Sequence, residues 1–286
     1  MELYNTSDLK GELMKIIDFR IRPPYRSIKE SLLYSRKPRS EENWGLNTAP
    51  SVLNESMEML LHEMDQANIT KAVVPLRRAF NMQNDDLVLL SNEYPNRFIG
   101  CPCLDPSNVN ISLNEIEQYI ISGIFNMIMM EPGKCSPPMK SDDKSIYPIY
   151  DICQKNNVPV LLSHGGFIPP DKKYNDTSSI HRIAEDFPNL KLVVCHAAWP
   201  YINEIIFEVK THKNVYLVPD MYMVNSPGDN DYITAANYLL QDKMIFASAY
   251  PLLPLEETIN FLKKKLRNEV WEKFFYSNAA KVLNLD

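Results

Sequence analysis

The first predicted strand of the chain reads Ile16-Ile17-Asp18-Phe19-Arg20-Ile21-Arg22-Pro23-Pro24 and ends in two arginines. Because side chains alternate between the faces of an extended strand, we expect Arg20 and Arg22 on one face, together with Asp18. A buried strand that presents two guanidinium groups requires an anion nearby, because an unpaired buried charge is costly. The two prolines end the strand. We therefore expect this strand end to form the floor of an anion-binding active site.

The same strand begins a regular alternation of apolar strands and amphipathic helices. Strands are predicted at 16–22, 69–76, 98–104, 123–130, 158–163, 190–195, 215–218 and 243–247. Helices are predicted at 51–68, 85–94, 112–122, 145–156, 177–186, 201–212, 231–240, 255–266 and 269–283. Eight such units predict an α/β protein with a (β/α)8 TIM barrel, a single domain over residues 1–286. A doubly wound open sheet is the alternative, but no glycine-rich turn follows the first strand.

The segment of about 23–50 separates the first strand from the first long helix. It reads as too polar for the core and is long enough to form a functional loop over the site. Substrate specificity is expected in loops such as 23–50 and 132–144.

Composition excludes several classes of partner. The chain has 286 residues and a net charge of −6, without a long run of lysine or arginine, which argues against a nucleic-acid partner. No apolar stretch approaches the roughly 18 residues that a membrane span needs. No secretion signal is recognised, and five cysteines without paired spacing indicate reduced thiols. We therefore expect a cytoplasmic protein with a small-molecule substrate.

Ionisable residues follow several predicted strands, where barrel enzymes carry their catalytic groups. His164 and His196 follow the fifth and sixth strands; a single histidine there is more often a packing residue, but two at equivalent positions favour acid–base chemistry. Glu131 and Asp220 each follow an apolar strand and border a proline, where a turn or capping role is about as common as catalysis. Tyr222 is close enough along the chain to reach the same site, and packing is an equal alternative.

Other polar residues are interpreted as structural. His62, His181 and His212 fall on predicted helices and are expected at the surface or in packing contacts. Ser248 is not a predicted nucleophile, because no G-x-S-x-G elbow surrounds it. Asp18 is expected to be a buried structural acid, paired with an arginine.

Several motifs together resemble the amidohydrolase superfamily, in its amidohydrolase-2 branch. The branch includes aminocarboxymuconate-semialdehyde decarboxylase, related aromatic-acid decarboxylases and pyrone-dicarboxylate lactonase. The motifs are Ile17-Asp18-Phe19, Asn189-Leu190-Lys191-Leu192-Val193-Val194-Cys195-His196-Ala197-Ala198-Trp199-Pro200, Lys213-Asn214-Val215-Tyr216-Leu217, Ile245-Phe246-Ala247-Ser248-Ala249-Tyr250-Pro251 and Asn278-Ala279-Ala280-Lys281-Val282-Leu283. The resemblance covers nearly the whole chain and implies a (β/α)8 barrel.

The resemblance also implies a change at the metal site. The family usually binds a divalent metal through an H-x-H pair on the first strand, a histidine on the fifth and an aspartate on the eighth. Arg20 and Arg22 stand at the H-x-H positions and Ala249 at the aspartate position, so only His164 remains. Arginine offers no lone pair to a metal. We therefore expect no metal cofactor, and some lactonases of this superfamily also work without one.

The predicted function is a metal-independent hydrolase acting on a small carboxylate-bearing compound, such as a lactone or similar ester. Arg20 and Arg22, with Tyr222, would bind the anion. His196 resembles the family's sixth-strand acid–base histidine. Asp220 and Glu131 would orient its imidazole or take a proton. His164 would be a second acid–base group or a hydrogen-bond donor to the substrate. The alternatives are a decarboxylase and a non-catalytic small-acid binding protein. A homodimer is compatible with the family.

Overall fold

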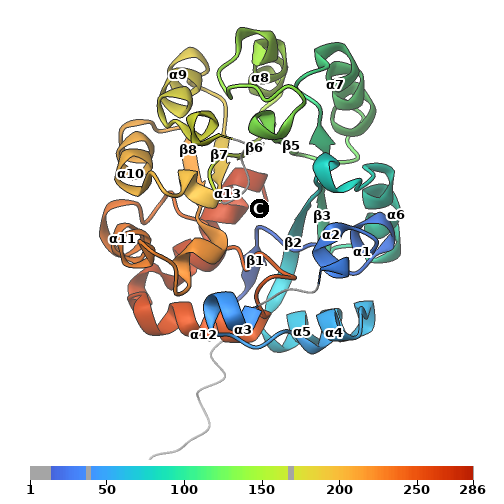
Figure 1. Ribbon diagram of the computed structural model, residues 1–286, viewed down its shortest axis with the longest axis vertical. Helices are drawn as coiled ribbons and strands as arrows, with labels where there is room; N and C mark the ends of the chain where they lie inside the picture. Colours follow the sequence, from blue (N-terminus) through green and yellow to red (C-terminus); the bar gives the residue numbers. More distant parts are fainter. Residues whose placement is uncertain (1–13, 37–39, 167–170, 286) are drawn as a thin grey trace, which may run out of the picture.

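The strands form the wall of a barrel, and the helices form a ring around it (Figure 1). The computed structural model describes residues 14–36, 40–166 and 171–285. The strands are β1 (Ile16–Asp18), β2 (Ile69–Pro75), β3 (Phe98–Cys101), β4 (Cys103–Leu104), β5 (Ile128–Met130), β6 (Val160–Ser163), β7 (Leu192–Cys195) and β8 (Val215–Val218). All neighbouring strands pair in parallel, in the orders β1-β2-β3 and β4-β5-β6-β7-β8.

Two irregular connections join these sheets into the predicted (β/α)8 barrel. The third predicted strand is divided into β3 and β4 at Pro102, whose carbonyl still accepts a hydrogen bond from Met129 N at 2.9 Å. The eighth predicted strand, 243–247, is not a regular strand, but Ile245 N donates to Leu217 O at 2.9 Å on one side. On the other side Phe19 N donates to Phe246 O at 3.0 Å. This segment therefore closes the barrel between β8 and β1.

The helices follow the predicted order with some interruptions. They are α1 (Arg26–Lys29), α2 (Leu32–Ser35), α3 (Ser40–Trp44), α4 (Pro50–Leu53), α5 (Met57–Gln66), α6 (Asp85–Glu93), α7 (Val109–Ile116), α8 (Tyr147–Lys155), α9 (Ser178–Asp186), α10 (Ile202–Thr211), α11 (Asp229–Thr234), α12 (Leu255–Lys265) and α13 (Asn278–Leu283). The predicted helix at 51–68 is divided because Ser56 caps α5, accepting a hydrogen bond from Met59 N at 3.2 Å. The predicted helices at 112–122 and 231–240 continue past α7 and α11 as π-helical turns.

The segment at 23–50 is not the polar loop that the sequence analysis expected. It contains three short helices, α1 to α3, and it buries Ile28, Tyr34 and Trp44. The Tyr34 hydroxyl donates to the carbonyl of Arg22 at 2.8 Å. The expectation that the segment is too polar for the core was wrong, because a few widely spaced apolar residues anchor it while polar residues dominate its composition.

The first strand is shorter than predicted. Regular pairing ends at Asp18, whose Oδ1 accepts hydrogen bonds from Arg20 N at 2.9 Å and from Ser248 N at 3.1 Å. Backbone pairing resumes after Arg20, because Ile21 N donates to Val73 O at 2.9 Å and Arg22 N donates to Tyr250 O at 3.0 Å. Asp18 is buried, as expected, but its described hydrogen bonds come from the backbone of Arg20 and Ser248 and not from an arginine side chain.

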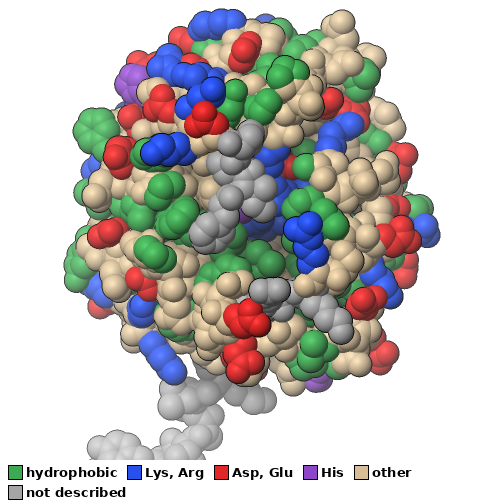
Figure 2. Space-filling view, viewed as in Figure 1, with side chains coloured by type: hydrophobic (Ala, Val, Ile, Leu, Met, Phe, Trp, Pro, Cys, Tyr) green, Lys and Arg blue, Asp and Glu red, His purple; other side chains and the backbone are tan. Residues whose placement is uncertain are grey.

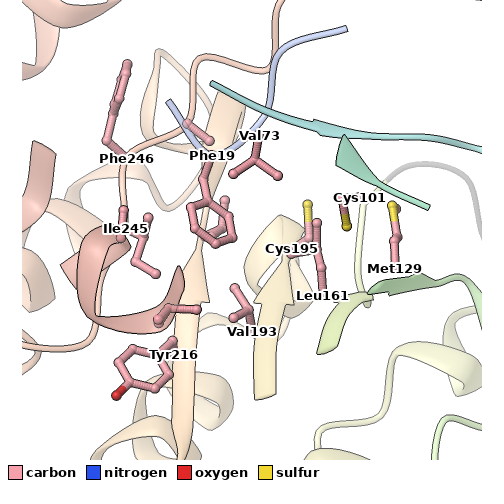
Figure 3. Packing of buried hydrophobic residues seen from close by; sticks show 14 of the residues in the cluster. Phe19, Val73, Cys101, Met129, Leu161, Val193, Cys195, Tyr216, Ile245 and Phe246 are labelled. Atoms are coloured by element: carbon pink, nitrogen blue, oxygen red, sulfur yellow. The ribbon is translucent and has the colours of Figure 1, made fainter. Parts of the chain in front are cut away.

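The barrel is filled by apolar side chains from successive strands. Figure 3 shows Phe19, Val73, Leu161 and Val193 packed in one cluster. The five cysteines are all free thiols. Among the described residues, no helix combines the length and the apolar character needed to cross a membrane.

One close approach brings the ends of β6 and β7 together. Gly165 has a φ of +106°, and a Cβ built there would lie 2.6 Å from backbone atoms of Ala198. Ala198 N donates to His164 O at 2.9 Å, so the two segments are also hydrogen-bonded. Only glycine satisfies both the positive φ and this spacing.

We predict that Gly165→Ala destabilises the protein more than Gly123→Ala does. Both positions have positive φ, but a Cβ at Gly123 would meet nothing within 4 Å. Gly165→Ala should lower the free energy of unfolding by more than about 3 kcal/mol, because overpacking adds to backbone strain. Gly123→Ala should cost only the strain, about 1–2 kcal/mol. Urea denaturation measures both, and equal losses would contradict the close approach.

Candidate active site

Three buried side chains from different strand ends meet in one cluster. Arg20 follows β1, His196 follows β7, and Asp220 follows β8. An Arg20 guanidinium nitrogen donates to Asp220 Oδ2 and lies 3.2 Å from His196 Nδ1. His196 Nδ1 is 3.0 Å from the same Asp220 oxygen. Arg20, His196 and Asp220, predicted separately, are therefore in direct contact.

The backbone at these strand ends is strained. His196, Ala197 and Ala198 have φ values of 65°, 46° and 54°, and Asp220 and Ala249 have values of 48° and 61°. Side-chain-bearing residues rarely adopt this left-handed conformation, which costs of order 1–3 kcal/mol each. The strain coincides with the positions that turn His196 and Asp220 toward each other, which supports a functional role for the cluster.

Burial and the neighbouring charges set the ionisation of this cluster. Burial, reinforced by the Arg20 charge, lowers the pKa of His196 to about 3, so its imidazole is neutral at neutral pH. Burial alone would raise the pKa of Asp220, but the adjacent His196 and Arg20 hold it below its usual value. The cluster therefore combines a neutral imidazole with an ionised carboxylate and a guanidinium.

Arg22 is a buried cation without a carboxylate partner among the described ion pairs. Its Nε donates to the carbonyl of Pro75 at 2.7 Å, while one of its terminal nitrogens has no hydrogen-bond partner. Burial, and then the charges of Arg20 and Arg77, depress the pKa of Arg22 well below its usual value. Such a group is stabilised by an incoming anion.

A second cationic group lies at the ends of β2 and β5. Arg77 Nε donates to Glu131 Oε1 at 2.9 Å, and Lys134 Nζ donates to the same oxygen at 3.0 Å and to Ser163 Oγ at 3.1 Å. Burial alone would raise the pKa of Glu131, but Arg77 and Lys134 hold it far below its usual value. Burial lowers the pKa of Lys134 to about 8, although Glu131 opposes this shift. Glu131 thus belongs to this second group and not to the His196 cluster.

His164 lies apart from both groups. Its Nδ1 is 3.1 Å from Ser141 Oγ, and its Nε2 is buried without a hydrogen-bond partner. Burial lowers its pKa to about 4. Its described hydrogen bonds do not include Arg20, His196 or Asp220.

A pocket of about 130 Å³ opens between the two cationic groups. Figure 2 shows Lys and Arg side chains in the hollow near the centre of this face. The polar lining comes from Arg20, Arg77, Lys134, His196 and Tyr222, and the remaining lining from Leu33, Phe80, Gly165, Gly166, Met221 and Leu252. A larger pocket, of about 240 Å³, adjoins it at Lys134, which lines both pockets.

Tyr222 forms an aromatic wall of the smaller pocket. Its ring stacks on Trp199 with centroids 5.2 Å apart, and it meets the His196 ring edge-on at 6.0 Å. A Cβ on Gly166 would lie 2.8 Å from the Tyr222 hydroxyl oxygen, so glycine makes room for this hydroxyl. The sequence analysis expected Tyr222 in the site, and the structure places it there.

The sequence analysis missed Arg77 and Lys134. Arg77 directly follows the second predicted strand, and Lys134 follows the fourth predicted strand after Pro132-Gly133. Arg20 is placed in the same way, just after the regular part of the first strand. The rule that barrel enzymes carry functional groups at strand ends would have identified Arg77 and Lys134, if it had been applied to every lysine and arginine there. Leu33, Phe80 and Leu252 come from short helical turns and a loop, where no periodic pattern indicates a direction.

Among the described residues, the buried group of possible metal ligands beside the pocket does not fit a divalent metal. Cys195, His196 and Asp220 offer ligand atoms within 4.8 Å of one another. However, the Arg20 guanidinium contacts both His196 and Asp220 from that space, and burial raises the pKa of the Cys195 thiol to about 11. A cation beside this guanidinium would be repelled, and a protonated thiol is a poor ligand.

Comparisons with known proteins agree with this architecture. The model of a family described as Amidohydrolase matches residues 33–285, a range that begins after Arg20 and Arg22. An uncharacterized TIM-barrel protein from Bordetella bronchiseptica is 34% identical, with a TM-score of 0.89 over 95% of this chain and 99% of its own. A search of the curated proteins finds no match.

More distant solved structures share the fold. The 2,6-dihydroxybenzoate decarboxylase from Rhizobium is 13% identical, with a TM-score of 0.69 over 96% of this chain and 100% of its own. The 5-carboxyvanillate decarboxylase from Sphingomonas paucimobilis is 14% identical, with a TM-score of 0.68 over 96% of this chain and 100% of its own.

Proposed function

Because the chain belongs to the amidohydrolase family, we propose that it is a metal-independent enzyme that hydrolyses a small carboxylate-bearing compound, such as a lactone or similar ester. The observation that carries the proposal is the contact of Arg20 with both His196 and Asp220 at the wall of the pocket. A fixed guanidinium supplies positive charge there, and a neutral imidazole supplies a base.

The excess of positive charge in the site supports an anionic substrate. The buried cations Arg20, Arg22 and Arg77 and the partly buried Lys134 lie in the same region as the ionised carboxylates of Glu131 and Asp220. Four positive side chains and two negative ones leave a positive balance, which persists even when Asp18 is counted as ionised. Arg22 lines neither pocket, but it has no carboxylate partner among the described ion pairs, and we assign it to bind the substrate carboxylate.

The hydrolytic step follows from the orientation of His196. With its Nδ1 proton donated to Asp220, the other ring nitrogen carries the lone pair and removes a proton from the attacking water. The protonated imidazole then returns this proton to the leaving oxygen. Positive charge from Arg20 and Lys134, which line the pocket, stabilises the oxyanion formed on the carbonyl. General base catalysis of this kind contributes about 10²–10⁴-fold.

The remaining predicted site residues receive supporting roles. Tyr222 packs against the substrate as the aromatic wall of the pocket. Glu131 holds Arg77 and Lys134 in place, since it accepts hydrogen bonds from both. His164 positions the loop that carries Ser141 and takes no part in proton transfer, because its contacts lie away from the cluster.

Decarboxylation is the second candidate reaction. An arginine bound to the departing carboxylate stabilises this anion in the ground state more than it stabilises the neutral carbon dioxide that forms. This difference raises the barrier to decarboxylation. The presence of two cationic groups removes this objection, because Arg77 and Lys134 can hold a second carboxylate while the first leaves. The distant structural neighbours named above are decarboxylases. A protein that binds acids without turning any over would instead be a non-catalytic binder.

We predict that Arg22→Met loses carboxylate binding without losing stability. Replacing an isolated buried charge by an apolar side chain of similar length leaves the free energy of unfolding unchanged or raises it. This holds although the hydrogen bond to the Pro75 carbonyl is lost. Calorimetry with the tightest ligand from a panel of aromatic and aliphatic acids should show at least about tenfold weaker binding, because charge-assisted hydrogen bonds contribute about 1.5–3 kcal/mol. Arg267→Met, on the surface, is the control. Unchanged affinity in Arg22→Met would overturn the assignment.

We also predict that kcat/KM falls as the pH rises through about 8. Lys134 is charged below its pKa of about 8 and neutral above it, so the site loses positive charge on the alkaline side. Toward acid the profile should stay level to about pH 4, because His196 remains neutral above its pKa of about 3. Lys134→Met should remove the alkaline fall.

The matched control for this profile is Lys243→Met. Burial also lowers the pKa of Lys243 to about 8, but Lys243 lies outside the pocket, over the ring of Tyr216. Its replacement should leave the profile unchanged. An alkaline fall that survives Lys134→Met, or disappears in Lys243→Met, would refute the role of Lys134.

A further inference from the structure

Two helices on the outside of the barrel present histidine and glutamate pairs to each other. His181 and Glu185 are four residues apart on α9, and Glu208 and His212 are four residues apart at the end of α10. Residues spaced in this way lie on one face of a helix. α9 and α10 are neighbours in the outer ring (Figure 1), so the two faces meet.

The four side chains form a continuous series of contacts. His181 Nδ1 is 3.1 Å from Glu208 Oε2, and His212 Nδ1 is 3.5 Å from the same oxygen. His212 Nε2 is 3.0 Å from Glu185 Oε1. The two imidazole rings meet edge-on with centroids 4.9 Å apart.

The hydrogen bonding of His212 leaves a lone pair facing a carboxylate. Its Nδ1 lies 2.8 Å from the backbone carbonyl of Glu208, an acceptor, so this nitrogen carries the proton in the neutral ring. Nε2 then offers its lone pair to the Glu185 oxygen at 3.0 Å, a repulsive contact unless a proton or a metal cation lies between them. A backbone carbonyl that holds the second nitrogen is the usual support of a metal-bound histidine.

The two carboxylates of the group have no lysine or arginine partner among the described ion pairs. The described ion pairs of Glu185 and Glu208 involve only His181 and His212. A divalent cation bound between these side chains would pair with both carboxylates.

We propose that His181, Glu185, Glu208 and His212 bind a divalent transition-metal ion of the zinc class. Two imidazole nitrogens and two carboxylate oxygens are ligands that zinc accepts, whereas calcium and magnesium require oxygen alone. In a tetrahedral zinc site, metal–ligand bonds of about 2.0–2.1 Å place the ligand atoms about 3.3 Å from one another. The contact of 3.0 Å between His212 Nε2 and Glu185 Oε1 and that of 3.1 Å between His181 Nδ1 and Glu208 Oε2 are close to this spacing. Ligand atoms of His181, Glu208 and His212 lie within 4.8 Å of one another.

The proposed site is separate from the pocket that contains His196. None of its four residues lines either cationic pocket. Its ion would fasten α9 to α10 and would stabilise the fold without taking part in the reaction. His181 and His212, which the sequence analysis placed among surface or packing residues, would then be ligands.

Zinc binding to chelator-treated protein, measured by calorimetry, tests the proposal. The wild-type protein should bind one equivalent at this site and unfold at a higher temperature when zinc is present. His181→Ala and Glu185→Gln should each weaken this binding at least about tenfold and abolish the thermal shift, because even supporting residues of metal sites contribute 10–100-fold. Both residues are largely exposed, so neither variant should disturb folding.

His62→Ala is the matched control, since His62 is an exposed histidine on α5 that is absent from the described metal-ligand groups. It should bind zinc as the wild-type protein does. If zinc also enters the Cys195-His196-Asp220 group, His181→Ala should remove one equivalent and leave the other. No zinc binding by the wild-type protein, or equal binding and equal thermal shift in His181→Ala, would overturn the proposal.

Discussion

The Arg20 guanidinium, held between Asp220 and His196, is the interaction on which the rest of the site depends. It places a permanent positive charge in the barrel end, and with burial it keeps the imidazole neutral. A guanidinium stabilises an oxyanion but offers no coordination position to water. In the proposed reaction His196 therefore activates the water.

The backbone conformation at the strand ends positions the side chains of this interaction. His196 and Asp220 are both in the left-handed conformation, and Gly165 allows the ends of β6 and β7 to approach closely. Strain of this kind persists only where the surrounding structure compensates for it, and here the filled barrel provides that support. The second cationic group, around Glu131, faces the same pocket and makes the site more positive than one ion pair would.

Much of this arrangement could be predicted from the sequence because barrel topology brings strand ends together. The alternation of strands and helices predicts the barrel, and the strand-end rule places Arg20, His196 and Asp220 near one another. The rule does not give side-chain direction, so it could not show that His164 turns toward Ser141. Neither periodicity nor composition indicated the buried aromatic anchors of the 23–50 segment, because they are few and irregularly spaced.

The most direct measurement compares turnover before and after removal of metal with a strong chelator. Lactones and aromatic acids are screened with acid release and carbon dioxide followed together, so that hydrolysis and decarboxylation are separated. The account predicts acid release without carbon dioxide, at the same rate in the treated and untreated protein and without stimulation by zinc or manganese. Turnover that disappears on chelation and returns with either ion would contradict the claim that an arginine serves where relatives use a metal.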